Sequence, residues 1–248
     1  MNPPIDPSKP APSRSAGVPP LPTPPPPLPP DASPGLLIET LLKRPAQLIE
    51  TLQQQGCGRL SAWLAIAALL ALAAYGLVVG SFSGGEQLVA APLKISLGAL
   101  LSMLICLPSL FIFGCLTGAE VTLRGTIGVL CAVLALTAML LIGFAPVAWV
   151  FSQSTESVAF IGALHLIFWS IALGFGLRLL RVFMDLLRVR DRVHLRVWSC
   201  IFILASFQMT TALRPIVGRS PHHFPTEKRF FLEHWFANIF DRAVVIAP

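Results

Sequence analysis

Polar residues inside otherwise apolar stretches are the first places to look for chemistry in this sequence. His165, Gln208 and Thr137 are of this kind, whereas no Asp or Glu lies near the centre of these stretches. A charge at the centre of a bilayer costs about 2.5 to 3.5 kcal/mol on insertion scales, so such groups are functional or paired. We expect Gln208 and Thr137 to form interhelical hydrogen bonds and His165 to be a packed, neutral histidine.

Metal-ligand residue types also gather near the C-terminus. They are His222, His223, Glu227, Glu233, His234 and Asp241. Their spacing matches neither His-Glu-x-x-His nor a Cys/His cluster, so no metal site is predicted. Apolar residues interleave with the last of them: Phe230, Phe231, Trp235, Phe236, Ile239 and Phe240. This pattern predicts an aromatic amphipathic helix at a membrane interface, with Phe231 and Trp235 as candidate partner contacts.

Two further motifs fail as catalytic or cofactor sites. The glycine-rich run from Gly80 to Gly85 has its serines out of place for Gly-x-Ser-x-Gly and lacks the Lys-Ser/Thr of a phosphate loop. The five cysteines show no Cys-x-x-Cys spacing and are expected to be small packing residues. The sequence therefore predicts a protein that is not an enzyme and has no cofactor.

The elements that carry these residues are five strongly apolar stretches between Arg59 and Pro215. We assign them to Leu60–Phe82, Pro92–Thr117, Gly125–Phe151, Val158–Phe183 and Val197–Leu213. A hydrocarbon core of about 30 Å needs roughly 20 residues of helix. A mean hydropathy of +0.73 with 12% charged residues fits a membrane protein better than a soluble domain. The predicted fold is an all-α polytopic bundle of five transmembrane helices, over residues 59–214, with flanking amphipathic helices.

The flanking segments divide into three parts. Residues 1–34 are rich in proline and are predicted to be a disordered cytoplasmic tail, either a soluble spacer or a Pro-x-x-Pro ligand for a partner. Residues 35–58 have helical apolar spacing, which predicts a short helix and then one over Pro45–Gln54. That segment either lies on an anionic membrane surface or packs on the bundle. Residues 215–248 form the outer tail.

Orientation follows from the basic residues next to the stretches. Arginines cluster in the joint after the fourth stretch, at 188, 190, 192 and 196, whereas the joint between the third and fourth stretches carries no basic residue. We therefore expect a bacterial cytoplasmic membrane protein with its N-terminus inside, its C-terminus outside and Arg214 at the outer interface. Lys94 and the basic C-terminal residues disagree with this count. The net charge of +6 does not predict nucleic-acid binding, because these residues form no stripe interleaved with aromatics.

Small residues and prolines predict how the helices pack. Gly76 with Gly80, and Gly114 with Gly118, each form Gly-x-x-x-Gly, which favours close helix approach. Pro108 and Pro146 are expected to kink the second and third stretches.

Several motifs resemble a known superfamily. They are Arg44-Pro45, Tyr75-Gly76 with Gly80 to Gly85, Leu93-Lys94, Leu107 to Leu110, and Leu213 to Gly218 followed by Phe224 and Phe230-Phe231. From about Lys43 to Phe236 the chain resembles the Yip1-like multi-pass membrane proteins, and most closely an uncharacterised bacterial family of that type. It lacks the Asp-Leu-Tyr-Gly-Pro signature of eukaryotic Yip1 proteins, which argues against a Rab-type partner. The resemblance implies a topology and no catalytic residue.

Two functions follow as expectations. The first is a non-enzymatic scaffold or accessory subunit of a membrane complex, with the lipid bilayer and a membrane-protein partner or a second copy as its partners. The alternative is a small transporter or channel subunit, whose path would be lined by the kinked second and third spans and would use His165.

Overall fold

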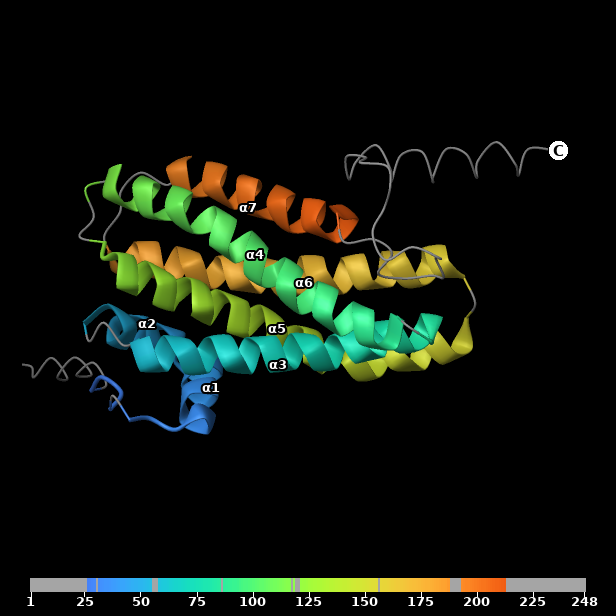
Figure 1. The fold of residues 1–248 in the computed structure, drawn as a ribbon. Helices are drawn as coiled ribbons and strands as arrows, with labels where there is room; N and C mark the ends of the chain where they lie inside the picture. Colours follow the sequence, from blue (N-terminus) through green and yellow to red (C-terminus); the bar gives the residue numbers. More distant parts are fainter. Residues whose placement is uncertain are drawn as a thin grey trace, which may run out of the picture.

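All the regular secondary structure in the described part of the chain is helical in the computed structural model (Figure 1). The structure describes residues 26–29, 31–54, 58–85, 87–116, 118, 121–155, 157–187 and 193–212. Its helices are α1 (Pro34–Lys43), α2 (Pro45–Gln54), α3 (Gly58–Ser83), α4 (Gln87–Leu116), α5 (Leu123–Ser154), α6 (Val158–Leu186) and α7 (Val193–Ala212). The predicted all-α class is therefore confirmed for these residues.

Four of these helices are long and apolar enough to cross a membrane. The spans are Gly58–Phe82, Gln87–Leu116, Leu123–Ser154 and Phe160–Leu186. They agree with the first four predicted stretches to within a few residues. The apolar part of α7, Arg196–Gln208, is shorter than these spans, and at 1.5 Å per residue it is only about 20 Å long. The fifth crossing therefore stays a prediction.

Helix α5 is the centre of the bundle. In the most apolar 18-residue stretch of α5, 61% is buried inside the protein. The buried share of the corresponding stretch is 39% in α3 and in α6, and 22% in α4. Helices α3 and α6 both pack on α5, while α4 lies mainly on α3 and carries α7 on its other side (Figure 1). Because α4 and α7 are the peripheral layer, most of their apolar surface is left for lipid or a partner.

Local sequence explains where several helices begin and end. Ser33, Thr122 and Ser157 are N-caps whose side chains accept hydrogen bonds from the backbone N–H three residues later. Gly84 and Gly118 have φ angles of +64° and +72° and lie in the turns after α3 and α4, where a side chain would be strained. Short turns therefore follow both helices.

Close contact between α3 and α4 depends on the first glycine pair. A Cβ atom at Gly76 would overlap the Cα atom of Pro92 and lie 2.8 Å from its nitrogen, and one at Gly80 would lie 2.5 Å from the carbonyl oxygen of Gln87. The predicted close approach is confirmed for this pair. It is wrong for the second pair, because Gly118 lies in a turn and Gly114 faces the side chain of Val121 rather than another helix.

Helices α1 and α2 pack on one end of the bundle. Their buried side chains include Leu37 and Leu41 from α1, and Leu48, Ile49 and Leu52 from α2. Helix α2 contacts α5 and α6, and α1 contacts α3 and α5. Helices α1 and α2, separated by Arg44 alone, are here called the hairpin. Of the two placements left open by the sequence, the structure has the one in which the hairpin packs on the bundle.

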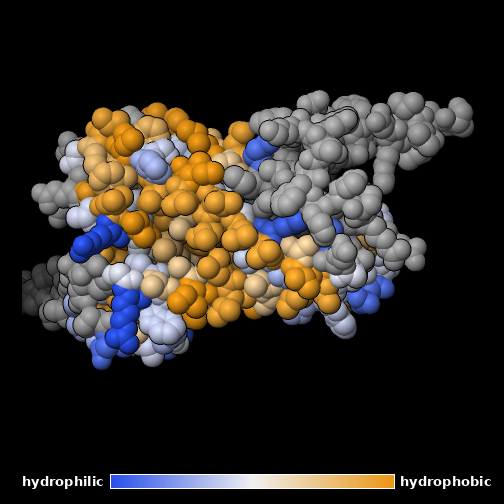
Figure 2. Space-filling view, viewed as in Figure 1, coloured by the Kyte–Doolittle hydropathy of each residue, from blue (hydrophilic) through white to orange (hydrophobic). Residues whose placement is uncertain are grey.

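The surface divides into an apolar middle and polar ends. Figure 2 shows hydrophobic side chains over the middle of the face formed by α4 and α7, and hydrophilic ones near α1 and α2. Exposed apolar residues of this kind include Leu104 and Ile105 on α4 and Val197 and Ile201 on α7. A band like this suits contact with lipid chains.

The tight α3–α4 contact predicts opposite outcomes for two glycine substitutions. Gly76→Ala should lower the free energy of unfolding by about 1 to 3 kcal/mol, because the added methyl group forces the two backbones apart. Gly174→Ala on α6 is the matched control, since no atom lies within 4 Å of its Cβ position. It should leave stability unchanged or slightly raised. Thermal unfolding in detergent measures both. Equal midpoints for the two variants would contradict this account of the contact.

Candidate functional site

A buried tyrosine–histidine pair is the main polar feature inside the bundle. The Tyr75 hydroxyl oxygen on α3 lies 2.6 Å from Nδ1 of His165 on α6. The rings meet edge to face, with centroids 5.6 Å apart and an interplanar angle of 89°. Tyr75 is 0% exposed and His165 is 8% exposed. A hydroxyl that donates to Nδ1 requires the neutral imidazole with its proton on Nε2.

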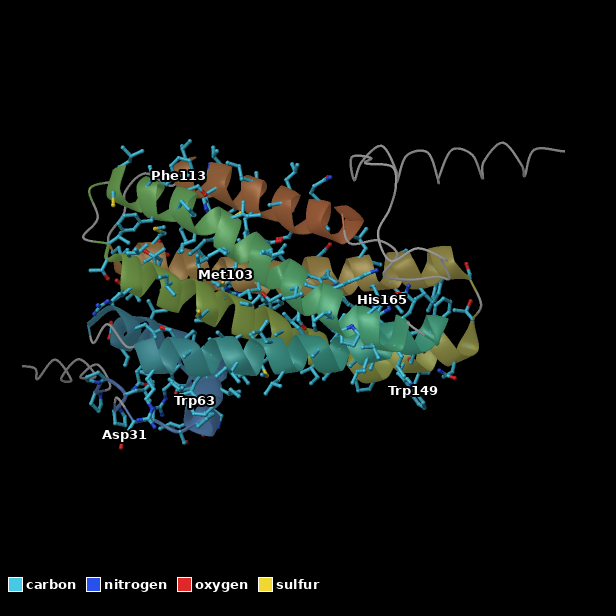
Figure 3. The ribbon with its side chains drawn as sticks, viewed as in Figure 1. Asp31, Trp63, Met103, Phe113, Trp149 and His165 are labelled. Carbon is cyan, nitrogen blue, oxygen red and sulfur yellow. The ribbon has the colours of Figure 1, made fainter. Side chains whose placement is uncertain are left out.

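This pair lies away from the hairpin and connects two helices that otherwise pack mainly on α5. Figure 3 shows His165 toward the end of the bundle opposite α1 and α2. A buried polar group without a partner costs about 1 to 3 kcal/mol, so each residue stabilises the other's burial. His165 is thus packed, as the sequence predicts, and Tyr75 is the partner that the sequence did not identify.

The other polar residues predicted inside the spans have different surroundings. The Thr137 hydroxyl donates to the carbonyl oxygen of Val133 at 2.9 Å, within α5. The predicted interhelical hydrogen bond of Thr137 is therefore wrong, because the preceding turn of its own helix already supplies the acceptor. A Cβ atom at Gly176 on α6 would lie 2.6 Å from the same hydroxyl, so this glycine allows the close approach of α6. Gln208 is half-buried on α7.

Trp198 attaches α7 to α4. Its indole N–H points to the carbonyl oxygen of Cys106 at 3.1 Å and to Oγ of Ser109 at 3.0 Å. The Ser109 hydroxyl donates to the same carbonyl at 2.8 Å. Trp198 is 0% exposed and stacks on Phe202, with centroids 5.0 Å apart. These contacts lie on both sides of Pro108 in sequence, so the indole covers α4 beside its proline.

No motif in the sequence distinguishes Trp198 from the other tryptophans. The only signal was its residue type, since a buried tryptophan usually finds an acceptor for its N–H. Three residues that the sequence predicts at the outer face, Arg214, Phe231 and Trp235, lie outside the described residues. Their roles stay predictions.

Basic residues gather at the end of the bundle that carries the hairpin. Those described there, or within a few turns of it, are Lys43, Arg44, Arg59, Arg124, Arg178, Arg181 and Arg196. Within the described ranges, Lys94 is the one Lys or Arg near the opposite end, and its side chain is buried. On the surface of α1, the Lys43 ammonium donates to Glu39 at 2.9 Å and lowers the pKa of that carboxyl group. The hairpin end is therefore the basic end.

A proline-rich segment lies on this end. Residues 26–29, here called the proline strap, follow the surface of α2. The N–H of Leu28 donates to Oγ1 of Thr51 at 3.1 Å, and Nε2 of Gln47 donates to the carbonyl oxygen of Pro26 at 2.6 Å. Leu28 is 5% exposed and belongs to the hydrophobic core cluster. The sequence predicts that these residues belong to the disordered tail, but the Leu28 side chain is buried against the hydrophobic core.

A small cavity lies between α2 and α6 at the same end. Its volume is about 140 Å³, and its lining is Ile49, Glu50, Gln53, Phe183, Leu186 and Leu187. Nε2 of Gln53 is buried with no hydrogen-bond partner among the described residues. Within the same part of the chain, no group of three or more His, Cys, Asp or Glu side chains is placed to hold a metal ion.

Comparison with known proteins gives no match. No family model matches the chain, and neither a curated protein nor a solved structure is similar to it at a significant level. The resemblance to Yip1-like proteins therefore stays a prediction.

The Tyr75–His165 contact predicts coupled energies in a double-mutant cycle. Tyr75→Phe and His165→Phe each remove one hydrogen-bonding group and keep a ring, so each should lower the free energy of unfolding by about 1 to 2 kcal/mol. The double variant should lose less free energy of unfolding than the two single variants lose together. The difference is the coupling energy, which should be about 0.6 to 1.7 kcal/mol. The control is Ser170→Ala, since this exposed hydroxyl on α6 bonds only its own helix. Additive losses in reversible unfolding in detergent would show that the two side chains do not act as a pair.

Proposed function

We propose that this chain is a multi-pass membrane protein that acts as a non-enzymatic scaffold or accessory subunit of a membrane complex. The observation that carries the proposal is the helical hairpin α1–α2, packed on the basic end of an apolar bundle with a proline-rich segment on its surface. A rigid platform that displays such a segment beside the membrane suits the binding of a partner protein.

The bundle interior supports a structural role over a transport path. Tyr75 and His165 bond each other, and Thr137 bonds its own helix. Trp198 of α7 packs on α4 beside Pro108. A transport path along a kinked α4 would need open polar surface at this place. The bonds of Tyr75 with His165 and of Trp198 with α4 hold helices together, and Thr137 is satisfied within its own helix.

The charge distribution supports a topology with the hairpin in the cytoplasm of a bacterial cell. Basic residues near helix ends favour the cytoplasmic side, and in the described residues they gather around α1 and α2. In this proposal α7 is the fifth crossing, and it places Arg214 at the outer interface and Phe231 and Trp235 on the outer surface. The sequence resemblance to Yip1-like proteins supports the same multi-pass arrangement.

Three surfaces face partners in this proposal. Inside the cell they are the proline-rich tail and the arginine-rich joint between α6 and α7, and outside it is the segment after Arg214. The tail is the one to test first, because the strap anchors its C-terminal end beside the basic surface of the bundle.

Deletion of residues 2–25 tests this function. The deletion ends before the proline strap, so the protein should still insert and unfold at the native midpoint. It should lose the partner protein that co-purifies with the native chain in mild detergent. The matched control is deletion of residues 2–18, which keeps the proline run and should keep the partner. An unchanged set of co-purifying proteins after the longer deletion, or none with the native chain, would rule out the tail as the docking element.

A further inference from the structure

The contacts of the proline strap have the form of a recognition site. Gln47 and Thr51 are one turn apart on α2 and therefore lie on the same face of the helix. Gln47 donates to the carbonyl oxygen of Pro26, and Thr51 accepts from the N–H of Leu28, two residues later. Two side chains thus bind the backbone of the strap at two points.

The Thr51 hydroxyl is held ready for a donor. Its hydrogen is donated to the carbonyl oxygen of Gln47 at 2.8 Å, which turns an oxygen lone pair toward the strap. Thr51 is fully buried. A buried oxygen in this state favours an N–H partner, because an unfilled acceptor there is costly.

The strap offers one donor and one apolar side chain. Proline has no N–H, so Leu28 supplies the only backbone donor between Pro26 and Pro30. Leu28 is buried, whereas Pro26, Pro27 and Pro29 are exposed. The features bound by α2 are therefore a leucine side chain, its N–H and the carbonyl two residues before it. Flanking prolines keep such a segment extended and lower the entropy lost on binding.

The same four-residue sequence occurs twice in this chain. Pro26-Pro27-Leu28-Pro29 forms the strap, and Pro19-Pro20-Leu21-Pro22 precedes it by seven residues. The earlier copy carries the same groups in the same order: a proline carbonyl, then a leucine N–H and side chain two residues later.

We propose that Gln47, Thr51 and the apolar core residues that bury Leu28 form a binding site for Pro-Pro-Leu-Pro segments, and that residues 19–22 are a second ligand of this site. The two copies then compete for α2 within one chain. Their short connection gives either copy an effective concentration of about millimolar, so one copy is bound and the other is free. This proposal goes beyond the proposed function and does not rest on it, because both ligands belong to the chain itself.

Thermal unfolding of full-length leucine variants tests the competition. Leu21→Ser should leave the midpoint unchanged, because the strap is already bound. Leu28→Ser should cause only a small drop, because residues 19–22 replace the strap. The midpoint of the double variant should drop by several degrees more than the sum of the two single drops. A double variant that fails to fold, while both single variants fold, supports the proposal in the same way. A midpoint for Leu28→Ser as low as that of the double variant would overturn the proposal.

A peptide added to the full-length chain tests recognition directly. The probe is a fluorescent peptide of residues 17–24, Gly-Val-Pro-Pro-Leu-Pro-Thr-Pro, followed by anisotropy in detergent. It should bind saturably to the folded Leu21→Ser, Leu28→Ser chain, and at least tenfold more weakly to the native chain, whose site is filled. Adding Thr51→Val to the double variant, or N-methylating the peptide leucine, should weaken binding at least fivefold. Equal binding of a peptide with serine in place of leucine would overturn the proposal, as would no saturable binding to a folded double variant.

Discussion

The absence of water in a bilayer is the constraint on which the rest of this structure depends. Backbone groups within the spans have to be bonded inside the protein, and helices do this segment by segment. The same rule applies to polar side chains. Tyr75 bonds His165, and Trp198 bonds the Cys106 carbonyl and Ser109. These few contacts join α3 to α6 and α4 to α7, pairs of helices that a uniformly apolar interface would specify poorly.

The packing around α5 gives this bundle a buried apolar core and an apolar exterior. Gly76 and Gly80 bring α3 against α4, and Gly176 brings α6 against α5. The hairpin α1–α2 then closes the basic end, and the proline strap lies across it. The protein therefore has a distinctive polar surface at that end, and this is why we place its partner contacts there.

Hydropathy and local signals predict much of this fold, because span length, proline positions and N-cap residues act over short sequence distances. Contacts between distant residues are harder to predict. Tyr75 and His165 are 90 residues apart, and Trp198 is 92 residues from Cys106, so only helix packing brings them together. Proline-rich composition predicts a disordered tail at Leu28, because a single apolar side chain does not alter that composition. The sequence predicts an interhelical bond for Thr137, because it does not show that the preceding turn of the same helix supplies the acceptor.

The central claim, that the hairpin end of the bundle lies in the cytoplasm, is tested most directly by labelling from outside the cell. Single cysteines replace Ser154, at the end of α5, and Arg190, in the joint after α6, in a chain whose five native cysteines have been removed. An impermeant thiol reagent added to intact bacterial cells should label position 154, and position 190 only after permeabilisation. Labelling of position 190 but not of position 154 in intact cells would contradict the proposed orientation and move the hairpin platform to the outer face.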